Sequence, residues 1–302
     1  MTSIAILGPG GVGGFLAGAL ARAGEDVTVV ARESSAQFIA GNGLQVQSAI
    51  LGDFHAQPTA VAKLDGPVDV LIIATKATSL DPALERVKTT PALVVPLLNG
   101  PAHIQRLRRH FPPERVAAGT IRIEAYRAEP GQIVHTSLFL RVDLASEHPE
   151  AAAPLEDLAQ RLGAAEVPAR IGPSEAQILW SKLVRLNALA LTTSASGERL
   201  GFIRSDPVWR EGLLGCLREG ASVARADGAE LDPEKPLGEL EGAHAELNSS
   251  MARDIAGGHE PELDAIAGSV LRAAGRHGIA CPTIDRLSAE VARRADIAPP
   301  RV

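Results

Sequence analysis

The first residues of the chain that can do chemistry form a glycine-rich run directly after a short apolar segment. Gly8-Pro9-Gly10-Gly11-Val12-Gly13 matches the pattern G-x-G-x-x-G, between apolar residues 4–7 and a helix-like segment that reaches Arg22. The three glycines of this pattern permit a tight turn, close approach of a pyrophosphate and close helix–strand packing. The run predicts a dinucleotide site, with a purely structural turn as the alternative. The residues expected at the cofactor are Gly8, Gly10, Gly11, Val12 and Gly13.

A cation follows the second apolar segment, residues 26–31, at the point where the choice between NAD and NADP is made. Enzymes that use NAD usually place Asp or Glu there for the ribose hydroxyl, whereas a 2′-phosphate needs a positive charge. Arg32 occupies this position and can hold a phosphate through two parallel hydrogen bonds, with Ser34 and Ser35 as further donors. We therefore expect NADP(H), while the neighbouring carboxylate of Glu33 leaves NAD as the alternative.

Two more polar residues end apolar segments that are rich in β-branched side chains. Lys76 follows residues 68–75, and Asn99 follows residues 92–98. Open α/β sheets gather ligands at the carboxyl ends of their strands, so a functional role is expected for both side chains. The alternatives are a solvated strand end for Lys76 and a simple turn for Asn99-Gly100.

The second half of the chain offers a lysine, a serine and a glutamate. Lys182 lies in a very apolar helical segment, where it either acts in a site or extends its ammonium group to the surface. Ser250 follows Asn248 in a polar stretch. Glu262 follows Pro261 in the expected first turn of a helix, where an acid is also explained by the helix dipole.

The order of the elements predicts an α/β protein with two domains. Apolar segments alternate with helical ones in the first half, which indicates a mostly parallel sheet. Residues 119–127, 132–136 and 138–144 look like strands without helices between them, so the sheet has an antiparallel or mixed edge. After Gly172-Pro173 the pattern is almost entirely helical, with helix starts at Ser174, Asp206-Pro207 and Pro261. We expect a Rossmann NADP-binding domain over 1–172 and a helical substrate and catalytic domain over 173–302.

Composition excludes several classes of protein. The 302 residues are 45% hydrophobic and 22% charged, which is typical of a globular chain, and a formal net charge of −6 without a basic cluster argues against nucleic acid. Cys216 and Cys281 lack metal-ligand spacing and are expected to be reduced, buried thiols, with no metal site. No stretch approaches the roughly 18 apolar residues of a membrane span. We expect a cytoplasmic protein, in which Ala- and Leu-rich helix faces either form its own core or pair in a homodimer.

These separate signals occur together in one family. The sequence resembles the ketopantoate reductases (2-dehydropantoate 2-reductases) over essentially its whole length. The segments that carry the resemblance are GPGGVGG (8–14), AR (31–32), ATK (74–76), LLNG (97–100), ILWSKL (178–183), NSSMARDI (248–255), PELDAIAG (261–268) and HGIACPT (277–283). The resemblance implies a Rossmann domain followed by an all-α domain like the C-terminal helical domain of 6-phosphogluconate dehydrogenase.

The resemblance also implies roles for the polar residues. It places the glycine turn, Arg32 and Lys76 at the cofactor, and Asn99 at the nicotinamide and the substrate. Lys182 resembles the general acid of the family, and an ammonium group there would stabilise and protonate the ketone oxygen that hydride transfer leaves negative. Ser250 and Glu262 resemble its substrate-positioning groups, and Glu262 either orients Lys182 or binds a substrate hydroxyl. Further substrate-binding candidates are Asn187 and Asn248.

The helix that carries the lysine departs from the family in two places. The family usually has asparagines four and eight residues after the lysine, whereas this chain has Leu186 and Ala190, with Asn187 one residue later. A less polar pocket suits a different or bulkier 2-oxo acid than ketopantoate. We expect NADPH-dependent reduction of a 2-oxo acid, ketopantoate first. The alternatives are another 2-oxo acid or an imine as substrate, and a non-catalytic NADP-binding sensor.

Overall fold

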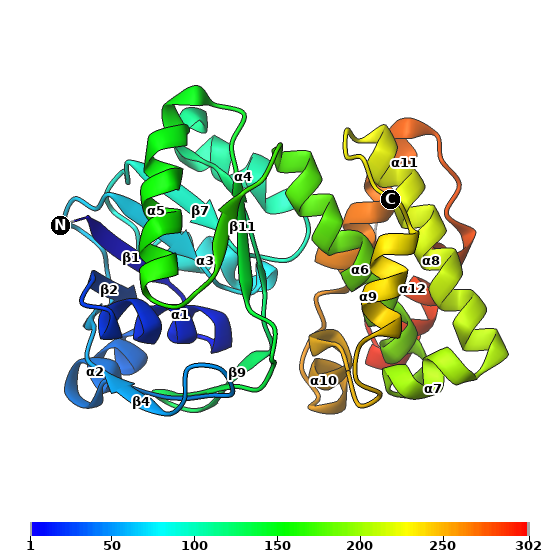
Figure 1. The fold of residues 1–302 in the computed structure, drawn as a ribbon, viewed down its shortest axis with the longest axis horizontal. Helices are drawn as coiled ribbons and strands as arrows, with labels where there is room; N and C mark the ends of the chain where they lie inside the picture. Colours follow the sequence, from blue (N-terminus) through cyan, green and yellow to red (C-terminus); the bar gives the residue numbers. More distant parts are fainter. Residues whose placement is uncertain (1, 301–302) are drawn as a thin grey trace. The chain divides into compact units, whose positions relative to one another are not determined.

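The computed structural model describes residues 2–300 and divides the chain into two compact units (Figure 1). The first unit reaches Leu98 and resumes over His103–Ile178, and the second holds Asn99–Ala102 together with the chain from Leu179 onward. Asn99 therefore belongs to the second unit, although the strand before it belongs to the first. Residues 173–178, which the sequence assigns to the helical domain, fall in the first unit.

The centre of the first unit is a five-stranded sheet in the order β5-β2-β1-β6-β7. All four strand pairs are parallel, as the alternation of strands and helices predicts. With β1 in the middle and later strands added on both sides, this is the order of a Rossmann sheet. The strands are β1 (Ser3–Leu7), β2 (Asp26–Val30), β5 (Thr59–Val61), β6 (Val70–Ile73) and β7 (Leu93–Pro96).

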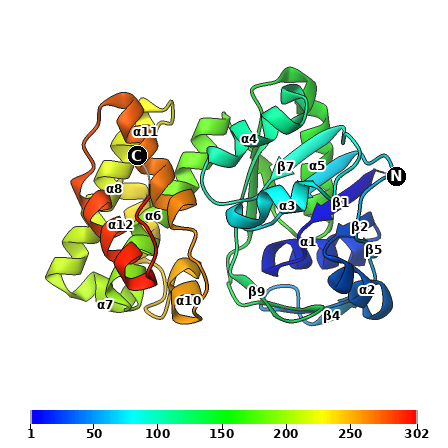
Figure 2. The same cartoon turned by 180° about the vertical axis from the view of Figure 1, so that it is seen from behind.

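The sheet is buried on both faces because side chains alternate along each strand. Ile4 and Ile6 of β1 join a core cluster that includes α1 and α5, whereas Ala5 and Leu7 join one that includes α3 and α4. Figures 1 and 2 show α5 and α3 on opposite faces of this sheet. The helices of the unit are α1 (Gly11–Arg22), α2 (Glu33–Asn42), η1 (Ala77–Ser79), α3 (Leu80–Leu84), α4 (Ala102–His110), η2 (Pro113–Arg115), η3 (Pro149–Ala151) and α5 (Ala152–Ala164).

Two smaller sheets complete the first unit, and both mix parallel with antiparallel pairs. The sequence predicted this mixture, but at an edge of the main sheet rather than in separate sheets. Their orders are β4-β3-β10-β9 and β12-β11-β8. The single strand expected over 119–127 is wrong, because the chain leaves its pairing with β11 after Arg122 and pairs with β10 from Ala125. The strands are β3 (Leu44–Ser48), β4 (Phe54–Ala56), β8 (Ala118–Arg122), β9 (Ala125–Glu129), β10 (Gln132–His135), β11 (Arg141–Ala145) and β12 (Ala169–Ile171).

The second unit is helical, and two of the three helix starts predicted after residue 172 are confirmed, although the first of them, at Ser174, falls in the first unit. The hydroxyl of Ser174 accepts the N–H of Gln177 at the start of α6, and Asp206 caps α8 by accepting from Val208 and Trp209. The third expected start is displaced: Ile266 donates to the carbonyl of Glu262, so Pro261 precedes the helix rather than opening it. The helices are α6 (Glu175–Ser196), α7 (Leu200–Ser205), α8 (Pro207–Ala226), α9 (Glu234–Glu241), α10 (Ser250–Ala256), the π turn η4 (Asp264–Gly268), α11 (Ser269–His277) and α12 (Pro282–Ala295).

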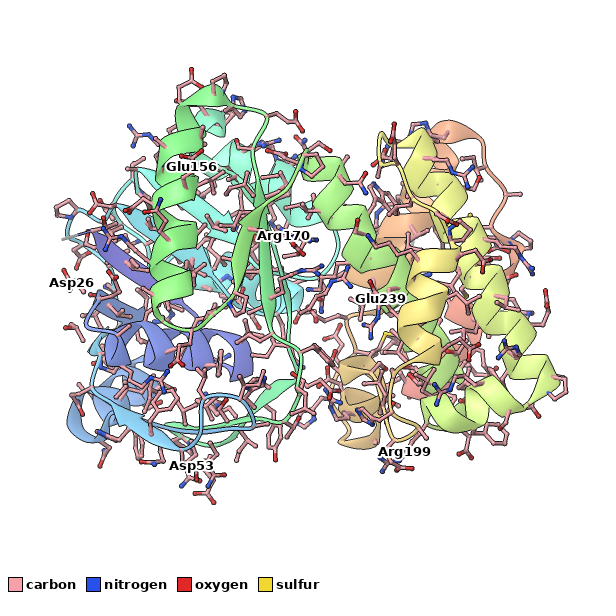
Figure 3. The ribbon with its side chains drawn as sticks, viewed as in Figure 1. Asp26, Asp53, Glu156, Arg170, Arg199 and Glu239 are labelled. Carbon is pink, nitrogen blue, oxygen red and sulfur yellow. The ribbon has the colours of Figure 1, made fainter. Side chains whose placement is uncertain are left out.

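Charged and apolar side chains separate as in other globular proteins. Charged side chains such as Asp53 and Arg199 lie on the outside (Figure 3), whereas the carboxylates of Asp143 and Glu175 are buried and paired with arginines. Cys216 and Cys281 are buried free thiols, and burial raises the pKa of Cys281 to about 11. Between residues 2 and 300, no helix combines the length and apolarity that a bilayer span requires.

His135 is a buried titratable residue of the first unit. It is 2% exposed, and its ring nitrogens pair with the hydroxyls of Ser48 at 2.8 Å and Ser137 at 3.1 Å. Its ring also lies edge-on to Phe15 of α1, with ring centroids 4.7 Å apart. Burial lowers the pKa of His135 because the charged imidazolium would lose its hydration.

The lowered pKa predicts a loss of stability on mild acidification. Below the ordinary histidine pKa of 6.5, the unfolded chain takes up a proton at His135 that the folded chain does not. The unfolding free energy contributed by this site therefore falls as the pH drops through that value. Urea unfolding of the wild type and of His135→Gln, followed between about pH 7 and about pH 5, is expected to show a steeper decline for the wild type. Parallel declines would contradict the assignment.

Candidate active site

The glycine turn joins β1 to α1 with the geometry that its sequence predicts. Gly8 has φ +96°, and its N–H donates to the carbonyl of Val30 on the neighbouring strand at 3.0 Å. A Cβ on Gly13 would lie 2.2 Å from the carbonyl oxygen of Gly8. The helix can therefore start this close to the strand only with glycine at position 13.

The start of α1 fits the phosphate groups of a dinucleotide. The helix begins after Gly10, and within the described chain no side chain caps it and its first turn has no acid. A Cβ on Gly10 would meet no atom of residues 2–300 within 4 Å, so the backbone there is open to approach. The hydroxyl of Thr75, beside Gly8, is buried and finds no hydrogen-bond partner in the same range of residues. An uncapped positive helix end next to open backbone suits an anion.

Arg32 and Lys76 lie at the same edge of the sheet as the glycine turn. Val30 and Ile73, the last residues of β2 and β6, are both register partners of Leu7. Arg32 follows β2 by two residues and Lys76 follows β6 by three, and both are exposed. The predicted cofactor residues thus come from the carboxyl ends of three adjacent strands.

Glu33 is the residue that keeps NAD as the alternative cofactor, and its side chain interacts with α2. It lies in the first turn of α2, where a carboxylate is favoured by the helix dipole. Its carboxylate also accepts a hydrogen bond of 3.0 Å from Gln37 one turn later. The position of Glu33 is therefore explained by contacts within α2 itself.

In the second unit the structure brings Asn99 and Glu262 together across 163 residues of sequence. Nδ2 of Asn99 donates to Oε2 of Glu262 at 2.9 Å. Gly100, with φ +74°, fits closely on the following turn, because a Cβ there would lie 2.0 Å from the carbonyl oxygen of Ala265. The bond fixes the orientation of the Asn99 amide and places a carboxylate beside it.

The turn that follows Glu262 is a π-helix, Asp264–Gly268, which passes directly into α11. Single π turns are rare and are found frequently at functional sites. Here Gly100 packs directly against the backbone of this turn. The segment Asn99-Gly100 is therefore held at two points, by the Glu262 carboxylate and by this turn.

Lys182 lies on α6, surrounded by core residues. Trp180, Leu183 and Val184 are 1%, 2% and 0% exposed, whereas Lys182 is half-buried. The ammonium group is therefore carried by a helix whose other faces are fixed in the core. Partial burial of Lys182 is compatible with both interpretations of this residue, namely a role in a site and extension of the ammonium group to the surface.

The polar stretch before α10 is held in place by Ser249, which the sequence did not single out. Its hydroxyl pairs with Thr193 of α6 at 2.8 Å and caps α10 by accepting the N–H of Ala252 at 3.0 Å. The side-chain oxygen of Asn248 accepts the N–H of Ser249 at 2.9 Å. Ser250, the first residue of α10, is exposed. A serine directly before a short helix is the signal that identifies such a cap.

Asn187 lies in a different environment from the other candidates. It is 0% exposed, and its amide has no hydrogen-bond partner among the residues that the structure describes. Five residues along a helix turn it about 140° away from Lys182, towards the side of Trp180. This position favours a place in the helical core, and its role at the substrate stays a prediction.

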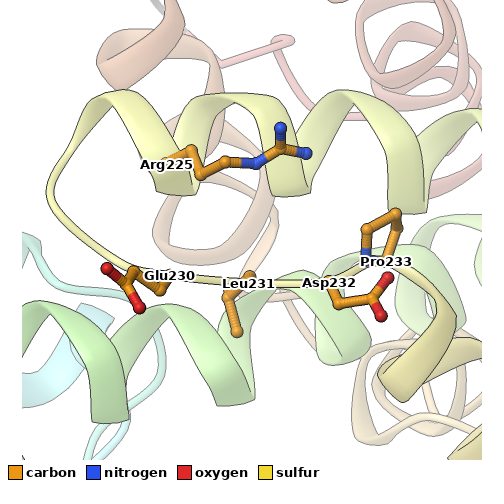
Figure 4. Close-up of a pocket in the computed structure, with 5 residues that line it drawn as sticks. All are labelled: Arg225, Glu230, Leu231, Asp232 and Pro233. Carbon is orange, nitrogen blue, oxygen red and sulfur yellow. The ribbon is translucent and has the colours of Figure 1, made fainter.

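Two other features bear on where ligands bind. A surface pocket of the second unit lies beside the loop after α8 and is lined by Arg225, Glu230, Leu231, Asp232 and Pro233 (Figure 4). This lining contains none of the residues that the sequence singles out. In the described part of the chain, no group of three or more His, Cys, Asp or Glu side chains is arranged to hold a metal ion.

A parallel Rossmann sheet with a glycine turn, followed by an all-α unit, is a fold of dinucleotide-dependent oxidoreductases. Residues 4–145 match the family model described as "Ketopantoate reductase PanE/ApbA", and residues 176–295 match its C-terminal counterpart. The chain is 31% identical to the 2-dehydropantoate 2-reductase of Mycobacterium tuberculosis, over 98% of each chain. It belongs to the ketopantoate reductase family, a family of oxidoreductases.

Two solved structures show the same fold. The 2-dehydropantoate 2-reductase of Geobacter metallireducens GS-15 superimposes with a TM-score of 0.88 at 27% identity, covering 96% of this chain and 99% of that one. A D-mandelate dehydrogenase with NADH and anilino(oxo)acetate gives a TM-score of 0.89 at 22% identity, covering 98% of both chains. The sequence-based prediction of a Rossmann unit with a helical C-terminal unit is confirmed.

Proposed function

We propose that the protein reduces a 2-oxo acid to the 2-hydroxy acid with NADPH, and that 2-dehydropantoate is the first candidate substrate. The observation that carries the proposal is the hydrogen bond between Asn99 and Glu262, which joins two of the predicted site residues from distant parts of the chain. Membership of the ketopantoate reductase family supports the reaction class. The predicted cofactor residues of the first unit support the requirement for a dinucleotide.

The cofactor would be held by the glycine turn, Arg32 and Lys76. The N–H groups at the start of α1 would bind the pyrophosphate, and Lys76 would add a positive charge at the adjacent strand end. Arg32 would hold the 2′-phosphate through its planar guanidinium. When bound, the nicotinamide supplies the hydride for the reduction.

The side chains of the second unit would handle the substrate and the proton. Lys182 would stabilise the negative charge that develops on the ketone oxygen and donate a proton to it. Glu262 holds the amide of Asn99 in one orientation, which prepares that amide to bind a substrate oxygen. Ser250 and Asn248 would position the substrate.

The cofactor preference can be tested at Arg32. We expect Arg32→Ala to raise the Kd for NADPH by about tenfold or more, because one charge-assisted phosphate contact is worth at least about 1.4 kcal/mol. The Kd for NADH should change by less than about twofold, since NADH lacks the phosphate. Isothermal titration of both cofactors checks this, with Arg109→Ala, an exposed arginine of α4, as a matched control. Equal losses for NADPH and NADH would remove Arg32 from the phosphate site.

A bulkier 2-oxo acid is the second candidate substrate. Leu186 and Ala190, which replace asparagines usual in the family, lie within about 80° of Lys182 around α6. Apolar side chains there favour a substrate with an apolar group next to its ketone. The fold is also shared by a D-mandelate dehydrogenase that was solved with anilino(oxo)acetate, an aromatic 2-oxo acid derivative.

A substrate panel tests the proposal and separates the two candidates. The loss of NADPH absorbance is followed with 2-dehydropantoate, 2-oxoisovalerate, 2-oxoisocaproate and phenylglyoxylate, and kcat/KM is compared across them. Turnover of at least one member supports the reaction class, and the highest value identifies the side chain that the site prefers. Tight binding of NADPH without turnover of any member would instead favour a cofactor-binding sensor.

A further inference from the structure

A single carboxylate in the second unit contacts both of the helical segments that bear on the proposed chemistry. Asp227 ends α8, and its Oδ2 accepts a hydrogen bond of 2.9 Å from the indole Nε1 of Trp180 on α6. Its Oδ1 accepts hydrogen bonds of 3.0 Å from Arg276 and from His277, which close α11. Asp227 therefore connects the end of α8 to α6 and to α11.

The first contact fixes how α6 is rotated about its own axis. Trp180 precedes Lys182 by two residues, so the two side chains point in directions about 160° apart. The indole of Trp180 is 1% exposed and among the largest fully buried side chains of the protein. Because an indole is rigid, holding its N–H at Asp227 sets the direction in which Lys182 leaves the helix.

The other two contacts fix the far end of the helix that follows Glu262. The chain runs from Glu262 through the π turn into α11 without interruption, and Arg276 and His277 form its last turn. Anchoring that end at Asp227 limits sliding of α11 along its axis. The same anchor therefore limits movement of Glu262, and of the Asn99 amide that it holds.

Asp227 is also an unfavourable residue for helix stability at this position. A carboxylate near a helix C-terminus interacts unfavourably with the dipole, and Asp227 lies at the C-terminus of α8 and beside that of α11. Burial by itself would raise the pKa of Asp227, but hydrogen bonds from His277, Trp180 and Arg276 outweigh it and hold the pKa below its ordinary value. The side chain is thus kept ionised by the groups that it connects.

We propose that Asp227 is a positioning residue for the reductase reaction, which sets the relative placement of Lys182 and the Asn99–Glu262 pair through Trp180, Arg276 and His277. This inference rests on the proposed function. It predicts that loosening the Asp227–Trp180 contact impairs turnover more than cofactor binding, because the glycine turn, Arg32 and Lys76, which would hold the phosphate groups of the cofactor, belong to the other unit.

The test compares Asp227→Asn, Trp180→Phe and the double variant with the wild type, using the best substrate of the panel. Asp227→Asn keeps the volume of the side chain and removes its charge, whereas Trp180→Phe removes the indole N–H together with part of a buried ring. Asp296→Asn, at the exposed C-cap of α12, is the matched control for the charge. We expect each single variant to lower kcat by about tenfold, with the KM for NADPH within about twofold of the wild type. The double variant should be no slower than the worse single, because both changes remove the same contact.

The two tryptophans of the chain provide a second readout that needs no turnover. The indole N–H resonance of Trp180 should shift in Asp227→Asn, whereas that of Trp209 should not. An altered Trp180 resonance with unchanged kcat would overturn the positioning role and leave the proposed function intact, as would losses that multiply in the double variant. A wild type that reduces no 2-oxo acid would overturn the proposed function, and this inference with it. If Asp227→Asn does not fold, the kinetics of Trp180→Phe test the proposal alone. A lower kcat with an unchanged KM for NADPH would support the positioning role, and an unchanged kcat would overturn it.

Discussion

Replacing Lys182 by alanine is expected to lower kcat for the 2-oxo acid by about a hundredfold or more. The ketone oxygen would lose both the positive charge that stabilises it and the group that protonates it. The Kd for NADPH should stay within about twofold of the wild type, since the predicted contacts to the phosphate groups of the cofactor lie in the first unit. Steady-state kinetics together with cofactor titration measure both quantities.

A second lysine of the same unit provides the control. Lys235 is exposed on α9, and the variant Lys235→Ala should have the same kcat as the wild type. A dependence of kcat on a proton donor should also disappear from the pH profile of Lys182→Ala. Near-normal turnover by the Lys182 variant would remove this residue from the mechanism.

Replacing Gly10 by alanine is expected to abolish most cofactor affinity without unfolding the first unit. Gly10 has φ −75°, which an alanine adopts readily, and a Cβ there meets no described atom within 4 Å. That open space is where the backbone would receive the pyrophosphate, so the added methyl group should raise the Kd for NADPH by at least about tenfold. Titration calorimetry and thermal unfolding together check the prediction.

Alanine substitutions at two other glycines serve as controls for this prediction. Gly41→Ala in α2 also adds a methyl group that no residue between 2 and 300 opposes within 4 Å, and it should leave the Kd unchanged. Gly13→Ala should lower the unfolding midpoint as well as affinity, because its Cβ would overlap the carbonyl of Gly8. Unchanged affinity in Gly10→Ala would contradict the phosphate-binding role of the turn.

The sheet and the first helix of the chain were predictable because their signals are strong and local. Strands β1, β6 and β7 are short runs of apolar residues, which are typical of buried strands. Helix α1 follows the glycine pattern G-x-G-x-x-G, which occurs between a strand and a helix in dinucleotide-binding domains. Helix α2 was not predicted, since its buried residues are Ala36 and Ile39 and its apolar face is weak. Helix α3 ends at Leu84, because the backbone of Arg86 and Lys88 bonds to that of Leu64 instead of continuing the helix.

The sequence singles out candidate site residues, but it does not predict how they are arranged. The sequence placed Asn99 at the end of a strand, beside the cofactor, and could not indicate that its segment belongs to the second unit. Its bond to Glu262 spans 163 residues, and no local pattern encodes a contact of that separation. Ser249 and Asp227 were missed for the same reason, since each acts through partners on other helices.

The transfer of a hydride from NADPH to the carbon of a 2-oxo group is the central claim, and isotope labelling tests it most directly. NADPH carrying deuterium at the transferable position of its nicotinamide is incubated with the protein and the best substrate of the panel, and the product is analysed by mass spectrometry and NMR. We predict a 2-hydroxy acid with one deuterium on the carbon that bears the new hydroxyl group. Consumption of the labelled cofactor without deuterium at that carbon, or no hydroxy acid at all, would contradict the claim.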